Sequence, residues 1–154
     1  MIHETEMIEI VDNKPYERPV ITKFQRFVDF KLWMTLVNKL NRDDLTTKLF
    51  PYEMKIDDGT TVKPNIFILE NDVPMLIVEA DHSAIKLEKY LASGVPEYWI
   101  VNQTENTVTT YHLYDNNYIS TVYRSGDAVP TLLDDKLAIN VDKLFRIDYT
   151  DEIN

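Results

Sequence analysis

The sequence predicts an α/β (α+β) fold in which helices flank a mixed β-sheet. Three observations indicate this class: a strand, a helix and a strand follow one another between residues 75 and 101, a long amphipathic helix precedes them, and short strands rich in Thr, Tyr, Val and Ile follow. The chain has 154 residues, of which 44% are hydrophobic, as expected for one globular domain over residues 1–154. No repeat or linker divides it.

The N-terminal part predicts a strand and then a helix. Glu6–Val11 is a short strand candidate, and Asn13-Lys14-Pro15 breaks it. Thr22 can cap a helix that starts at Phe24 and ends before residues 41–44. The apolar stripe of this helix is Phe27, Leu32, Trp33, Leu36, Val37 and Leu40. Such a wide stripe predicts that the helix packs on a sheet.

The middle of the chain predicts a β-hairpin that carries a polar residue. Phe50–Ile56 alternates sufficiently for a strand, residues 57–60 contain the Asp-Gly turn signal, and a second strand covers Val62–Leu69. Asn65 lies in that second strand, and a turn at residues 71–74 leads to the strand that ends at Glu79. Asn65 and Glu79 are therefore expected on neighbouring strands, within reach of one bridging metal ion.

The strand, helix and strand unit carries the candidate chemistry. Met75–Val78 is an apolar run typical of a buried strand, and a carboxylate such as Glu79 at its end must be paired, protonated or bound to a cation. Lys86 follows on a helix that Gly94 stops, and Glu97–Val101 returns as a second apolar strand.

The C-terminal part predicts mostly β-structure. Thr107–Leu113 and Tyr118–Tyr123 form a hairpin around a polar turn, residues 124–135 form a loop, and Leu137–Ile139 is a short edge strand. Val141–Phe145 is a helical turn, and the last four residues are expected to fray. The predicted order of elements is β-α-β-β-β-α-β-β-β.

These motifs resemble the Uma-two family of putative restriction endonucleases, a branch of the PD-(D/E)XK nuclease superfamily. The matching residues are Glu79, Lys86, Tyr90 and the run Gly94-Val95-Pro96-Glu97-Tyr98-Trp99-Ile100-Val101-Asn102, with Pro64-Asn65 and Glu9-Ile10-Val11-Asp12-Asn13 upstream. The resemblance implies a restriction-endonuclease-like sheet and a Mg²⁺- or Mn²⁺-dependent endonuclease acting on DNA. It also implies a homodimer, for which the hairpin Val108–Tyr123 is one candidate interface.

Carried over residue by residue, the resemblance implies Glu79 and Lys86 as catalytic residues. Glu79, Asn65, Glu9 and the Ala80 carbonyl are the implied metal ligands. The sequence departs from the family pattern at two of its motifs, with Asn65 where the family has Asp and Phe24-Gln25 where it often has His-Gln. A neutral amide binds Mg²⁺ more weakly than a carboxylate, so the departure at Asn65 predicts weakened or lost activity.

Each candidate residue also has an ordinary structural interpretation. Glu79 can be an ordinary ion-pair partner at a strand end, and Lys86 can be a solvated lysine on a helix. Lys89 is a weaker candidate for the role of Lys86. The Asn65 side chain can satisfy a strand-entry turn. Glu9 fits a polar residue that points outward from a short strand. Of the residues after Glu79, Asp81 is expected to point with it and His82 away from it, and Asp81 or Ser83 can cap the helix. His112 is expected as a surface strand residue.

Composition limits the other classes of function. With no cysteine there is no disulfide and no thiolate zinc site, and His3, His82 and His112 lack a metal-binding spacing, so a hard-cation oxygen site remains. A glycine-rich phosphate loop is missing from the sequence, and no apolar run reaches the roughly 20 residues that cross a membrane, which favours a cytoplasmic protein.

The net charge of −10 opposes DNA binding, although a basic rim around the site would offset it. The basic residues expected there are Lys23, Arg26, Lys55, Lys63, Lys86 and Lys89. The alternative is a catalytically inactive, nuclease-like binding module that serves as an inhibitor, regulator or assembly subunit. Its acidic surface would bind a basic protein partner.

Overall fold

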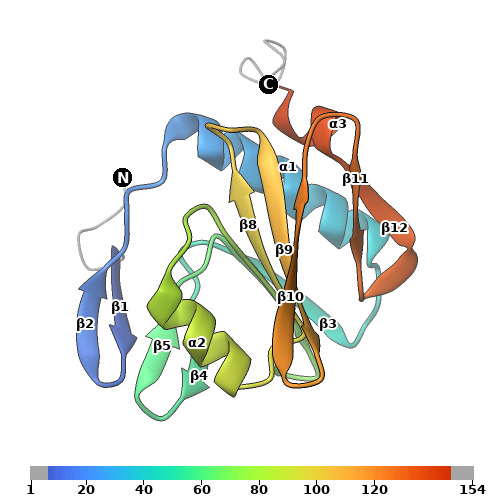
Figure 1. Ribbon diagram of the computed structural model, residues 1–154. Helices are drawn as coiled ribbons and strands as arrows, with labels where there is room; N and C mark the ends of the chain where they lie inside the picture. Colours follow the sequence, from blue (N-terminus) through green and yellow to red (C-terminus); the bar gives the residue numbers. More distant parts are fainter. Residues whose placement is uncertain (1–6, 147–154) are drawn as a thin grey trace.

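The computed structural model describes residues 7–146, which form twelve strands and three helices (Figure 1). The first half contains β1 (Ile8–Val11), β2 (Lys14–Glu17), α1 (Lys23–Lys39), β3 (Leu45–Leu49), β4 (Met54–Asp57), β5 (Thr60–Val62) and β6 (Ile66–Glu70). The second half contains β7 (Val73–Glu79), α2 (Ala84–Ala92), β8 (Glu97–Asn102), β9 (Thr107–Tyr114), β10 (Asn117–Tyr123), β11 (Ala128–Thr131), β12 (Asp134–Asn140) and α3 (Val141–Phe145).

A six-stranded mixed sheet is the centre of the molecule. Its strand order is β10-β9-β8-β7-β6-β3, and every neighbouring pair is antiparallel except β7 and β8. Parallel strands need a crossover connection, and α2 supplies it. The predicted strand, helix and strand unit is therefore confirmed, as is the predicted α/β (α+β) class with helices that flank a mixed sheet.

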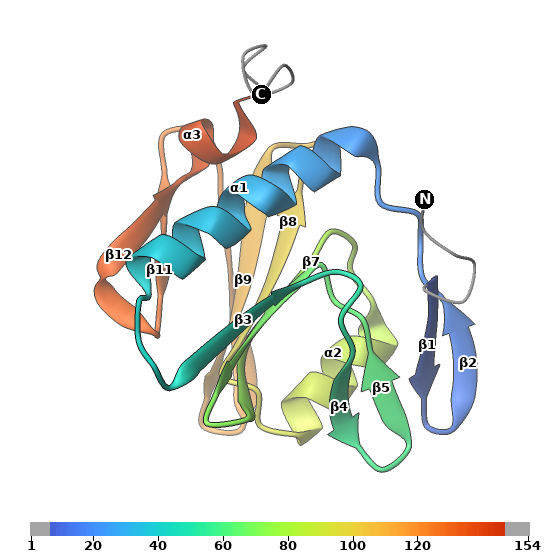
Figure 2. The same cartoon turned by 180° about the vertical axis from the view of Figure 1, so that it is seen from behind.

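The two faces of this sheet are covered by different helices (Figures 1 and 2). On one face α1 packs through Val28, Leu32 and Leu36 into a core that also includes α3 and β12. On the other face Tyr90 of α2 packs with Tyr98 of β8, and β4 and β5 add Met54 and Val62. Strand alternation divides β7 between these cores, since Val78 faces the first and Ile77 the second.

Local sequence signals explain where both long helices begin. The Thr22 hydroxyl accepts a hydrogen bond from the Gln25 N–H at 3.1 Å at the start of α1, as predicted. Ser83, rather than Asp81, caps α2 by accepting from the Lys86 N–H at 3.3 Å. Gly94, with φ +72°, follows the end of α2, where the left-handed conformation favours glycine.

A smaller sheet with the order β2-β1-β5-β4 lies beside the main sheet and differs from the prediction. The first strand ends at Val11, as predicted, but Asp12 and Asn13 take φ values of 51° and 65° and form a two-residue hairpin turn into β2, where a loop was expected. The predicted strand over residues 62–69 is divided between β5 and β6, so Asn65 lies in the connection just before β6.

Two other predicted segments are also wrong. The predicted strand over residues 50–56 starts only at Met54, and β3 was missed although it forms the far edge of the main sheet. Within the predicted loop over residues 124–135, the chain forms β11 and the start of β12, which pair as a two-stranded sheet. Residues 1–6 and the C-terminal residues 147–154, whose last four were expected to fray, lie outside the described residues. Between residues 7 and 146, the structure has no helix long and apolar enough to cross a membrane.

Candidate functional site

Glu79 is the last residue of β7, and two side chains of α2 contact it. Lys86 and Tyr90 are four residues apart and therefore lie on the same face of α2. The Lys86 ammonium pairs with Oε1 of Glu79, and the Tyr90 hydroxyl donates to Oε2 at 3.0 Å. Glu79 is only 3% exposed, so this carboxylate is held inside the protein by two partners from one helix.

Glu9 reaches the same ammonium from the smaller sheet. Lys86 Nζ lies 3.0 Å from Oε1 and 3.3 Å from Oε2 of Glu9, and the backbone N–H of Lys63 donates to Oε2 at 2.7 Å. Glu9 is also 3% exposed. We call Glu9, Lys86 and Glu79 the acid-lysine cluster. It joins the two sheets, because Glu9 comes from β1 and the other two residues from β7 and α2.

The acid-lysine cluster borders a cavity of about 150 Å³. Two buried carboxylates share one ammonium there, so these three side chains together carry one negative charge in excess. The other charged or titratable side chains on the wall are Tyr16, Glu17, Arg18, Asp81 and His82. Asp81 and His82 both border the cavity although they were expected to point in opposite directions, because β7 ends at Glu79 and strand alternation stops there.

Burial determines the protonation state of Tyr90, which is hydrogen-bonded to Glu79. Burial first, and then the nearby Glu79 charge, raises the pKa of Tyr90 well above its usual range, so its hydroxyl keeps its proton. A protonated phenol can only donate to the carboxylate that faces it. Tyr90 therefore fixes the orientation of Glu79.

Asn65 lies in a second, fully buried polar cluster. Arg18 Nη2 donates to Asn65 Oδ1 at 2.7 Å, and Asn65 Nδ2 donates to Asp29 Oδ2 at 2.7 Å. Gln25 Nε2 donates to the other oxygen of Asp29 at 2.7 Å. Burial raises the pKa of Asp29 from 3.8 to about 6, and the hydrogen bonds from Gln25 and Asn65 limit that rise. We call these four residues the Asn65 network.

The structure thus brings together three of the four residues expected at the site through their side chains. Glu9, Glu79 and Lys86 are in contact, whereas both polar ends of Asn65 are bonded to Arg18 and Asp29 rather than to a strand-entry turn. Ala80 follows Glu79 directly and is half-buried, so its carbonyl is near the cluster in the chain.

Several other expected residues lie elsewhere. Lys89 forms an ion pair with Asp12, and its Nζ lies 3.3 Å from Asp57 Oδ2. It therefore links the β1-β2 and β4-β5 hairpins of the smaller sheet and does not pair with Glu79. His112 is half-buried on β9, with Nε2 3.5 Å from Glu97 Oε2. Of the six basic residues expected around the site, only Lys86 borders the cavity.

Neither Arg18 nor Asp29 was predicted from the sequence as a site residue. Asp29 had a signal, since it is an acid one helical turn after Gln25 and next to the apolar stripe of α1. Arg18 had none, because its partner Asn65 is 47 residues away.

The acid-lysine cluster suits a divalent cation by its donor chemistry but not by the number of its side-chain ligands. Among residues 7–146, no three His, Asp or Glu side chains are placed to hold a metal ion together. Mg²⁺, however, is commonly bound by only one or two carboxylates and completed by water and substrate phosphate. Glu9 and Glu79 supply two carboxylates and a surplus negative charge, so the donor chemistry suits a hard cation.

The fold defines the class of protein, a restriction-endonuclease-like domain. A model of the Uma2 family, described as putative restriction endonuclease, matches residues 1–142, and the chain belongs to this family. A putative nuclease of the DUF820 group from Anabaena variabilis has a similar solved structure, with a TM-score of 0.74 and 16% sequence identity over 94% of this chain and 93% of that one. At that identity the likeness shows the fold alone. No curated protein matches the chain.

Proposed function

We propose that this protein is an endonuclease that hydrolyses phosphodiester bonds of DNA with Mg²⁺ or Mn²⁺, and that Asn65 makes it weak. One observation carries the proposal: Glu9, Glu79 and Lys86 converge, buried, on one wall of a cavity. Family membership supports it, because the family is described as putative restriction endonucleases.

The energetics of the acid-lysine cluster favour a functional role. Burying an ion pair gains little stability compared with an apolar replacement, and burying a surplus charge is more costly still. Glu9 and Glu79 are each 3% exposed and share a single ammonium. A binding or catalytic task explains why such a cluster is kept, since groups of this kind are common at active sites.

Each residue has a role in the proposed reaction. Glu79 and Glu9 would hold the cation, with help from the Ala80 carbonyl, and Lys86 must then release at least one carboxylate. A bound Mg²⁺ supplies a Lewis acid that polarises the phosphate and acidifies a coordinated water. The freed Lys86 ammonium would orient the attacking water and offset the negative charge that develops on the phosphate. Tyr90 would keep Glu79 in place throughout.

Asn65 is the proposed reason for low activity. Its carbonyl oxygen, the only atom of its side chain that can bind a cation, already accepts a hydrogen bond from Arg18. As a neutral group it would also add less to cation affinity than a carboxylate at the same place. We therefore expect Asn65→Asp to raise activity.

A plasmid nicking assay with Mg²⁺ or Mn²⁺ tests this proposal. The chain is compared with Asn65→Asp, with Asn41→Asp as a matched control that makes the same charge change at an exposed position, and with Glu79→Ala to detect contaminating nucleases. Nicking that is absent in Glu79→Ala and greater only in Asn65→Asp supports the proposal. No nicking by any variant, or equal nicking by Glu79→Ala, contradicts it.

The second candidate is a catalytically inactive binding module, and the Asn65 network favours it. All the polar atoms of the Asn65 side chain have protein partners, so this side chain is used as a structural connector. The module would use the acidic surface implied by a net charge of −10 to bind a basic protein. Silence in the nicking assay together with co-purification of a basic partner would favour it.

A homodimer and a cytoplasmic location belong to the same proposal. Cutting both strands of a duplex is served by two copies of the site. β10 is an edge strand of the main sheet and exposes Ile119 (55%) and Val122 (46%), which suits an interface at the hairpin predicted over residues 108–123.

A further inference from the structure

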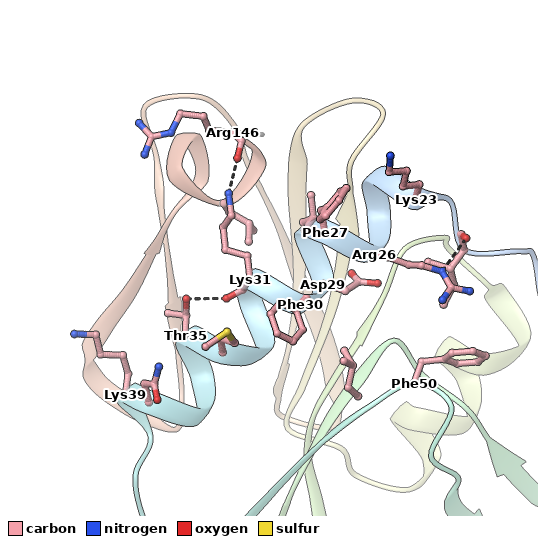
Figure 3. A pocket seen from close by; sticks show the side chains of 16 residues that line it. Lys23, Arg26, Phe27, Asp29, Phe30, Lys31, Thr35, Lys39, Phe50 and Arg146 are labelled. Atoms are coloured by element: carbon pink, nitrogen blue, oxygen red, sulfur yellow. Dashed lines mark hydrogen bonds between the residues drawn. The ribbon is translucent and has the colours of Figure 1, made fainter. Parts of the chain in front are cut away.

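A groove of about 970 Å³ runs along the outward face of α1 (Figure 3). Its walls also include Leu49 at the end of β3, Phe50 directly after it, Leu144 of α3 and Arg146 directly after α3. It is separate from the cavity beside the acid-lysine cluster, which shares no lining residue with it.

The charge of this groove is opposite to that of the whole chain. Five basic side chains line it: Lys23, Arg26, Lys31, Lys39 and Arg146. Among residues 7–146, Asp29 is the single acid on its wall, and it is 3% exposed and hydrogen-bonded inward to Gln25 and Asn65. The chain as a whole has 26 acidic and 16 basic residues, so the grouping of cations here is a local feature.

The floor of the groove is apolar and partly aromatic. Phe30 is 49% exposed and Met34 is 44% exposed, and Phe27 and Phe50 are half-buried in the same wall. Figure 3 shows Lys39 and Arg26 at opposite ends of the groove, with Phe30 between them and Phe50 near Arg26. Cations that follow a sugar-phosphate backbone and aromatic rings that stack with bases are the two features of sites for single-stranded nucleic acid.

The groove is connected to the candidate site through the Asn65 network. Asp29 lies in the groove wall, and Arg18 lies in the cavity wall. Asn65 joins them with hydrogen bonds of 2.7 Å on each side.

From these observations we infer that the α1 groove binds single-stranded nucleic acid, with phosphates on its cations and bases on Phe30 and its aromatic neighbours. This inference goes beyond the proposed function, because the groove shares no lining residue with the cavity beside Glu79 and Lys86. A symmetric contact between two copies of the groove is disfavoured, since it would bring two sets of five cations together.

Fluorescence anisotropy with a labelled oligo-dT strand in EDTA tests the inference without any metal or cleavage. The double variant Arg26→Glu/Lys39→Glu is compared with Lys14→Glu/Lys136→Glu, which makes the same charge change at exposed positions outside the groove. We expect the groove variant alone to weaken binding, and the slope of log affinity against log salt to become shallower by about 0.7 for each lost phosphate contact. Phe30→Ala is expected to weaken binding by about fivefold or more.

Three results would overturn the inference: no binding by the unmodified chain, equal losses in both double variants, or displacement of the oligonucleotide from the unmodified chain by an acidic amphipathic peptide that binds more tightly. The last would identify the groove as a docking surface for a protein helix. The Glu79→Gln variant separates this inference from the proposed function, because it should bind the strand normally while it fails to nick DNA. Binding without any nicking activity would leave the groove in place and reject only the nuclease.

Discussion

Replacing Lys86 with methionine is the most direct test of the acid-lysine cluster. The substitution keeps most of the apolar stem and removes the ammonium that pairs with Glu9 and Glu79. Both carboxylates would then be buried next to each other with no counter-ion. Breaking a buried ion pair by removing one partner typically costs 3–5 kcal/mol.

The structure places the expected loss at the lower end of that range, about 3 kcal/mol. Glu79 keeps its hydrogen bond from Tyr90, and Glu9 keeps the one from the Lys63 backbone. The free energy of unfolding, measured by urea denaturation at pH 7, checks this magnitude. Millimolar Mg²⁺ should then restore stability to Lys86→Met, by about 2.7 kcal/mol when its concentration is 100 times the dissociation constant.

Lys89→Met is the matched control, because Lys89 is on the same helix but pairs with exposed acids. It should lose little stability and show no response to Mg²⁺. If Lys86→Met is too unstable to purify, the triple variant Glu9→Gln/Lys86→Met/Glu79→Gln should fold, since it removes the charges together. A loss below about 1 kcal/mol in Lys86→Met, or an equal Mg²⁺ response in Lys89→Met, would refute the reasoning.

Three further changes test other parts of the structure. Burial raises the pKa of Asp29 from 3.8 to about 6, so the folded state holds this proton more tightly than the unfolded state. The proton therefore contributes about 3 kcal/mol to the free energy of unfolding. This contribution is complete below pH 4 and is lost as the pH rises through 6. Urea denaturation of Asp29→Asn between pH 4 and 7 should show a flatter pH dependence, and an unchanged slope would rule out Asp29 as its source. Tyr90→Phe should lower the free energy of unfolding by about 1–3 kcal/mol because Glu79 loses a buried donor, and a neutral effect would mean that water replaces the hydroxyl. Leu32→Ala, in the core between α1 and the sheet, should cost about 2–5 kcal/mol in the same assay, and a smaller loss would show that the core collapses around the gap.

The parts of the fold that the sequence predicts well are those with strong local patterns. The helix α1 has a wide apolar stripe and the Thr22 cap, and the unit from β7 to β8 has the apolar run Met75–Val78 followed by Ser83 and Gly94. The missed strands β2 and β3 are short and half-buried or exposed, so their side chains carry no clear alternation. β3 is held by its pairing with β6, which is a long-range contact that no local pattern reveals.

In the candidate site too, the residues in a local motif were predicted and those in long-range contacts were not. Glu79 and Lys86 are seven residues apart in one recognisable motif, and the family pattern supplied Glu9. The Asn65 network depends on partners 36 and 47 residues from Asn65, and nothing near Arg18 marks it as a buried donor. Burial itself decides the pKa of Asp29, and burial is a property of the assembled fold rather than of the neighbouring sequence.

The division of the acid-lysine cluster between two sheets has a consequence for local stability. Glu9 belongs to a small sheet of short strands, and Glu79 belongs to the main sheet between two cores. Small, peripheral units of a protein open more often than its centre, so the small sheet can separate while the main sheet stays folded. Each such opening takes Glu9 away from Lys86 and leaves Glu79 with the whole ammonium. Amide hydrogen exchange of β1 and β5 therefore reports how often the site is complete, and a ligand that needs both carboxylates should slow that exchange.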